Sequence, residues 1–172
     1  MREKKIEDNL SFITWIVENK TKNKVGMVTL ARDAIRFSFS DGGEAVESYE
    51  RVEKTLDSWL HLIREIYNNP SINYVKIDRK DNLVKVGDKI IDIKTFEDNL
   101  KERLITKIEY ECILNNIPYK GLENLYQCTP TEIMNVYSDL QLCIKNYCPS
   151  RRPVIPISLE IYTKGSRDIL KL

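Results

Sequence analysis

The chain has 172 residues, and its 27 lysines and arginines against 26 aspartates and glutamates leave a formal net charge of only +1. The overall field therefore gives no argument for nucleic acid or for a membrane surface, although a local basic patch stays open. With 42% hydrophobic and 31% charged residues, the composition excludes a disordered chain. The length predicts a single domain over 1–172, with segments 1–43, 44–116 and 117–172.

The sequence also bears on compartment. The start is charged, and no stretch approaches the roughly 18 consecutive apolar residues of a membrane helix. We therefore expect neither a signal peptide nor a membrane partner, and a cytoplasmic location. The four cysteines are then interpreted as thiols in a reducing compartment: Cys112, Cys128, Cys143 and Cys148. The alternative is a zinc site, but their spacing matches no familiar ligand pattern.

The first 43 residues predict a helix followed by a β-hairpin. Apolar residues recur every three or four positions over 5–19, which is typical of an amphipathic helix. The basic run from Lys20 to Lys24 ends it. Residues 25–31 and 34–40 are expected to pair around a turn, because apolar and polar residues alternate in the second segment.

The middle and the end of the chain predict further helices and strands. A continuous apolar stripe within 44–68 predicts the clearest helix of the chain. Thr129, Pro130 and Glu132 are typical of a helix start, with a capping box between Thr129 and Glu132. The remaining expected elements are strands at about 73–79, 83–87 and 89–94, a helix at about 96–116 and a final strand at 157–162. The fold class is therefore α+β: an N-terminal helix and β-hairpin, a central α-βββ-α unit, and an additional C-terminal helix and strand.

The three central strands carry the one constellation that suggests chemistry. Asp78 closes the first strand, and Asp92 and Lys94 lie two positions apart on the third. The period of two of a strand places Asp92 and Lys94 on one face, and the order of the three strands can bring Asp78 or Asp81 beside them. Two carboxylates can hold a hard divalent cation such as Mg²⁺ or Mn²⁺. A neighbouring ammonium can stabilise charge on a phosphoryl oxygen, so the set predicts metal-assisted phosphodiester hydrolysis.

These motifs resemble the RecB-like and Cas4-like branch of the PD-(D/E)xK nuclease superfamily. Ile77-Asp78-Arg79 is similar to the family's Ile-Asp-Arg motif, and the segment 90–95 is similar to its apolar strand ending in Asp-x-Lys-Thr. His61 precedes them on a helix, as in the family, and the α-βββ-α order matches the family core. The resemblance implies that His61, Asp78 and Asp92 bind the metal and that Lys94 assists catalysis. Thr106 stands where the family has glutamine.

Each of these residues also has a structural interpretation. In a chain so rich in charge, Asp92 and Lys94 could simply form the polar side of a strand that alternates with isoleucines. His61 could be a surface residue paired with Glu65, one helical turn away.

Two basic clusters complete the set of candidates. Lys20, Lys22 and Lys24 precede the expected hairpin, and Arg151 and Arg152 precede the expected last strand. They are candidate contacts for nucleic acid or ordinary solvated loops. Two functions therefore stay open: a metal-dependent DNA nuclease or its inactivated descendant, and a non-catalytic adaptor or accessory module in a nucleic-acid or viral protein assembly.

Overall fold

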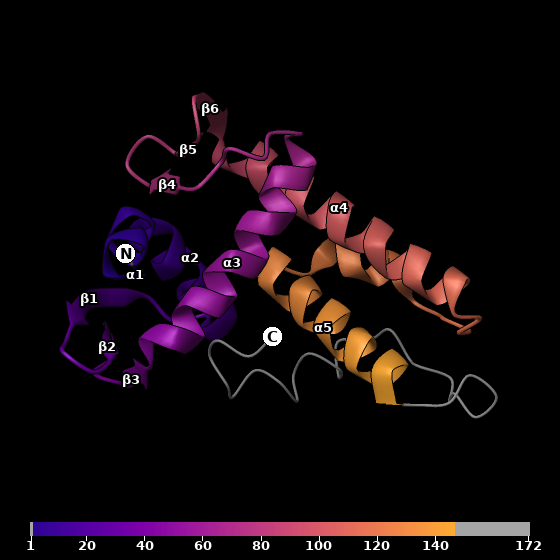
Figure 1. Ribbon diagram of the computed structural model, residues 1–172, viewed down its shortest axis with the longest axis horizontal. Coiled ribbons are helices and arrows are strands. Elements are labelled where there is room, and N and C mark those ends of the chain that lie inside the picture. Colours follow the sequence, from indigo (N-terminus) through magenta and orange to yellow (C-terminus); the bar gives the residue numbers. More distant parts are fainter. Residues whose placement is uncertain (1, 147–172) are drawn as a thin grey trace. The chain divides into compact units, whose positions relative to one another are not determined.

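A computed structural model of the chain describes residues 2–146 (Figure 1). Arg151, Arg152, Cys148 and the strand expected at 157–162 lie outside the described residues. The internal contacts divide the chain into two compact units, residues 1–96 and 97–172. The α+β class is confirmed: N-terminal helices, two three-stranded antiparallel sheets, and helices between and after them. Within the described part of the chain, no helix combines the length and the apolar character needed to span a membrane.

The first unit begins with two helices, where a single helix over 5–19 was predicted. Helix α1 spans Arg2–Asp8 and helix α2 spans Leu10–Thr21. They separate at Asn9, whose φ of −112° and ψ of 15° leave the helical region. The Asn9 side chain is fully buried and bonds the backbone of a distant segment, so a tertiary contact interrupts the helical pattern.

Three strands form the first sheet, called sheet A. They are β1 Val25–Leu30, β2 Ile35–Phe39 and β3 Glu44–Glu47, in the order β1-β2-β3. Ile35 and Phe37 are fully buried, which confirms the alternation expected for this hairpin. The prediction that residues 44–47 belong to the following helix is wrong. These residues pair with β2 in full register, and this pairing outweighs the helical preference of glutamate and alanine.

Helix α3, Tyr49–Ile66, follows sheet A directly. The Ser48 hydroxyl caps it by accepting the backbone N–H of Arg51 at 3.2 Å. Its predicted stripe is buried: Val52, Leu56, Trp59, Leu60 and Ile63 are each at most 1% exposed. Trp59 packs edge-on against Phe12 and Trp15 of α2, so α3 lies in the core of this unit.

The second sheet, called sheet B, follows α3 and matches the three predicted strands. It contains β4 Val75–Asp78, β5 Leu83–Val86 and β6 Lys89–Asp92, in the order β4-β5-β6. Figure 1 lets the reader follow the chain from sheet A through α3 to sheet B. The third strand ends at Asp92, because helix α4 already begins at Ile93. The predicted strand 89–94 is therefore two residues too long.

Helix α4 spans Ile93–Leu114, and all but its first turn belongs to the second unit. A 3₁₀ helix, η1 Leu122–Gln127, and helix α5, Pro130–Asn146, complete the described chain. The predicted capping box is present. Thr129 Oγ1 accepts the backbone N–H of Glu132 at 3.3 Å, and Glu132 Oε2 accepts that of Thr129 at 3.2 Å.

Candidate functional site

The strand register of sheet B places the two predicted metal ligands in one row. Asp78 of β4 and Asp92 of β6 both lie opposite Leu83 of the central strand. Side chains directly opposite share a face of the sheet, so both carboxylates project from the same side. Leu83 stands between them, and two strand spacings correspond to about 9.5 Å between their backbones. The sequence thus predicted correctly that both residues lie on one sheet, and the structure shows that the central strand separates them.

Both carboxylates bind backbone groups beside them. Asp78 Oδ1 accepts the N–H groups of Lys80 at 3.1 Å and of Asp81 at 3.2 Å, which closes the turn between β4 and β5. Asp92 Oδ2 accepts the N–H groups of Lys94 at 3.1 Å and of Thr95 at 3.3 Å. These are the bonds of a helix N-cap, so Asp92 starts α4.

Lys94 and His61 do not join the carboxylates in the way predicted. Lys94 lies in the first turn of α4, so the expectation of one strand face shared with Asp92 is wrong. On α3, His61 Nε2 lies 3.1 Å from Glu65 Oε1, and the His61 side chain is 73% exposed. This is the surface pair considered from the sequence. Over residues 2–146, no group of three or more histidine, cysteine, aspartate or glutamate side chains is arranged to hold a metal ion.

The N-terminal basic cluster is only partly available at the surface. Lys20 is buried, with 8% of its area exposed, so the interpretation of this residue as part of a solvated loop is wrong. It lies on the inner side of α2, which continues to Thr21 instead of ending before the basic run. Lys22 and Lys24 are exposed, and Lys22 adopts the left-handed conformation that ends α2.

A groove lies between α2 and sheet B in the first unit. It is open to solvent and has a volume of about 790 Å³. Helix α2 contributes Leu10, Ser11 and Thr14 to its lining, and sheet B contributes the rest: Lys76, Ile77, Asp78, Arg79, Leu83, Lys85 and Ile90. Apolar side chains and cations therefore line the same space.

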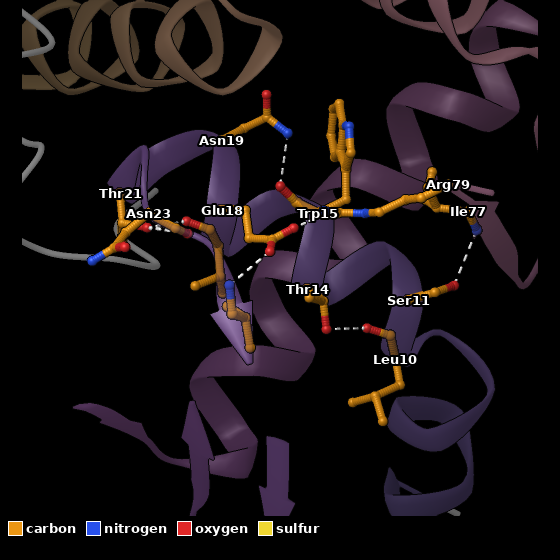
Figure 2. Close-up of polar contacts among 12 residues, drawn as sticks. Leu10, Ser11, Thr14, Trp15, Glu18, Asn19, Thr21, Asn23, Ile77 and Arg79 are labelled. Carbon is orange, nitrogen blue, oxygen red and sulfur yellow. Dashed lines mark hydrogen bonds and ion pairs between the residues drawn. The ribbon is translucent and has the colours of Figure 1, made fainter. Parts of the chain in front are cut away.

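Side chains at the start of α2 hold β4 against the groove. Asn9 Oδ1 accepts the N–H of Val75 at 2.9 Å. Ser11 Oγ accepts the N–H of Ile77 at 3.0 Å (Figure 2). Asn9 Nδ2 also donates to the carbonyl of Asn73 at 3.2 Å. Two outward N–H groups of edge strand β4 are thus satisfied by side chains at the start of α2, which makes pairing of this edge with another chain less favourable.

A partly buried ion pair connects the turn of sheet B with α2. Figure 2 shows Arg79 reaching Glu18, whose side chain is only 10% exposed. Glu18 also accepts the N–H of Val25 at 2.7 Å, at the start of sheet A. Burial lowers the pKa of Arg79, but a guanidinium remains charged at neutral pH. Arg79 therefore has its own carboxylate partner and positions the β4–β5 turn.

The remaining cations of the groove lie side by side. Lys76 and Lys85 are directly opposite each other on β4 and β5. Their ammonium groups lie 5.7 Å and 5.9 Å from the centre of the Tyr74 ring, and the Tyr74 hydroxyl donates to the carbonyl of Gly87 at 3.2 Å. Both ammonium groups thus gather over one aromatic ring.

Sequence reasoning missed this group, although a signal was present. Tyr74, Lys76 and Asp78 occupy alternate positions of one predicted strand, and Leu83 and Lys85 do so on the next. A period of two places each set on one face. The register between the strands, which brings the two lysines together, depends on a turn that the spacing alone did not define.

Comparisons with known proteins add no assignment. No family model, no curated protein and no solved structure matches the chain. The function must therefore be argued from the groove and its side chains.

Proposed function

We propose that the protein is a non-catalytic accessory module that binds nucleic acid on sheet B. The observation that carries this proposal is the cross-strand pair of Lys76 and Lys85 at the groove. Like charges directly opposite in a sheet destabilise it. A phosphate placed between two such ammonium groups removes this repulsion and gains charge-assisted hydrogen bonds.

The surroundings of the two lysines support the same ligand. Neither Lys76 nor Lys85 belongs to an ion pair within the part of the chain that the structure describes, whereas the nearby Arg79 is paired with Glu18. Both lysines are exposed, so a polymer can approach them. Because the net charge is only +1, this attraction is local and acts within about 8–10 Å at physiological salt.

Binding to a labelled 20-nucleotide oligomer, measured by fluorescence anisotropy at several salt concentrations, tests the proposal. The variant Lys76→Gln/Lys85→Gln should bind about tenfold more weakly. Its slope of log affinity against log salt should fall by about 0.7 for a single strand, because the contact with the one phosphate between the two lysines is lost. The matched control Lys54→Gln/Lys120→Gln removes the same charge from exposed positions elsewhere and should bind as the wild type does.

Two results would count against this function. Absence of salt-dependent binding would overturn it, and so would equal weakening by both double variants.

The metal-dependent nuclease activity with Mg²⁺ or Mn²⁺ stays a separate prediction. A cytoplasmic location is also part of the proposal, supported by three cysteines that form no disulfide within the described residues: Cys112, Cys128 and Cys143.

A further inference from the structure

The apolar residues of the groove raise a question that phosphate binding does not answer. Ile90 is 68% exposed on β6, in the same register row as Lys76 and Lys85. Leu83 and Leu10 line the groove beside it. An exposed isoleucine and two half-buried leucines next to a cross-strand pair of lysines suit a ligand that offers an apolar surface and an anion together.

We infer that the groove accepts an unpaired base of a single-stranded nucleic acid, with its flanking phosphate at Lys76 and Lys85. This inference rests on the proposed function and specifies its ligand. In a duplex the flat faces of the bases are stacked inside, so only an unpaired base can lie against Leu83 and Ile90. A duplex could use the lysines alone.

The charges around the groove orient this ligand. The lysine row and the row with Asp78 and Asp92 are neighbours on the same face of sheet B. Phosphate is attracted to the first row and repelled by the second. The uncharged base therefore lies toward Leu83, in the row of the carboxylates, where it brings no negative charge close to them. The nucleic-acid strand crosses the sheet with its phosphates on the side of Tyr74.

The size of the groove agrees with one or a few bases. Its volume of about 790 Å³ lies in the range of small-molecule pockets, and it is open to solvent, so the chain on either side of a bound base can leave freely. Tyr74 provides the aromatic ring over which the ammonium groups of Lys76 and Lys85 lie, so that both cations are held on one side of the bound base.

The test compares one sequence as a single strand and as a duplex, with wild-type protein and two variants. Ile90→Ser should weaken single-strand binding about fivefold, because contact of roughly 40 Å² of apolar surface with a base is lost. It should leave duplex binding unchanged. Val46→Ser is the matched control: Val46 is 51% exposed on β3, an edge strand of the other sheet, and its change should affect neither ligand.

The outcomes separate this inference from the proposed function. Wild-type preference for the single strand, lost selectively in Ile90→Ser, supports it. Salt-dependent binding that is equal for both ligands and insensitive to Ile90→Ser overturns it and leaves the proposed function standing. Failure to bind either ligand overturns both. Circular-dichroism melting of each variant shows that the fold is retained.

Discussion

The carboxylate of Asp92 accepts the backbone N–H of Lys94 at 3.1 Å. From the sequence, these two residues were expected to act together in catalysis. The bond instead belongs to the first turn of α4, where an acceptor satisfies N–H groups that have no partner within the helix. The same Asp-x-Lys spacing is thus found at the start of a helix, where the aspartate caps the helix and the lysine side chain has no necessary role beside it.

Asp92→Ala should lower the free energy of unfolding by about 0.5–2 kcal/mol, the usual cost of removing an N-cap. If Asp92 and Asp78 instead formed a closely spaced acidic pair without a metal, this change would remove the repulsion between the two carboxylates and would raise the free energy of unfolding. Urea denaturation of the wild type and the variant decides between the two. Asp92→Ser is the control, because serine caps a helix nearly as well and should restore most of the loss. An unchanged or increased stability of Asp92→Ala would contradict the capping role.

A second prediction concerns cleavage. A non-catalytic module should bind a DNA oligomer without cutting it, with or without Mg²⁺ or Mn²⁺, as followed on denaturing gels. Asp92→Asn separates the two roles, because asparagine keeps the cap but is a poor ligand for a hard cation. Metal-dependent cleavage by the wild type that disappears in Asp92→Asn would establish the nuclease and exclude the non-catalytic proposal.

Local patterns predicted those parts of the fold that depend on neighbours in sequence. The stripe of α3 and the capping box of α5 are signals of this kind, and the turns of sheet B separated its strands correctly. The break at Asn9 was not predictable, because its cause lies at Asn73 and Val75. Strand β3 was missed for the same reason: its pairing with β2 decides a segment whose composition favours a helix.

The candidate site divides along the same line. The sequence placed Asp78 and Asp92 on one sheet, and the register places each of them opposite Leu83 on the two outer strands. The sequence could not show that each of these side chains binds adjacent backbone N–H groups, because aspartate is common in turns, at helix starts and in metal sites. The approach of Lys76 to Lys85 depends on strand register, which a hairpin turn determines.

A third prediction tests how α2 protects β4. Asn9→Ala removes the acceptor for the Val75 N–H and the donor for the Asn73 carbonyl, and leaves buried polar groups unpaired. We expect a loss of about 2–4 kcal/mol in unfolding free energy. Asn19→Ala is the control: its amide donates to the Trp15 carbonyl within the same helix, so the loss should stay below about 1 kcal/mol. Equal losses in both variants would show that the bonds of Asn9 to β4 and Asn73 stabilise the fold no more than a bond within one helix does.

The fourth prediction concerns the core. Leu60 of α3 is fully buried, so Leu60→Ala should cost about 2–5 kcal/mol through lost burial and the cavity left behind. Ser58→Ala, at an exposed position of the same helix, should change stability by less than about 0.5 kcal/mol. Chemical denaturation measures both. A loss below about 1 kcal/mol for Leu60→Ala would mean that this face of α3 is not part of a rigid core.

The last prediction uses the cysteines of the second unit. Burial, and then the nearby charge of Glu111, raises the pKa of the Cys112 thiol. Its thiol form is therefore favoured in the folded state. Below the pKa of an unfolded cysteine, about 8.5, both states carry the proton and the contribution to stability is complete. As pH rises above that value, the unfolded chain ionises first and gains free energy, so stability is lost as pH rises toward the folded pKa.

The measurement compares urea midpoints of the wild type and Cys112→Ala between pH 7 and pH 10. Tyrosines and lysines also begin to titrate near the upper limit, but they do so in both proteins, so the difference between the two curves isolates Cys112. We expect the wild type to lose stability more steeply above about pH 8.5, by up to roughly 1.4 kcal/mol per pH unit. Cys143, whose pKa burial and Asp139 also raise, is only partly buried, so its variant should change the slope less. Parallel curves for the wild type and Cys112→Ala would show that this thiol ionises as easily in the folded protein as in the unfolded chain.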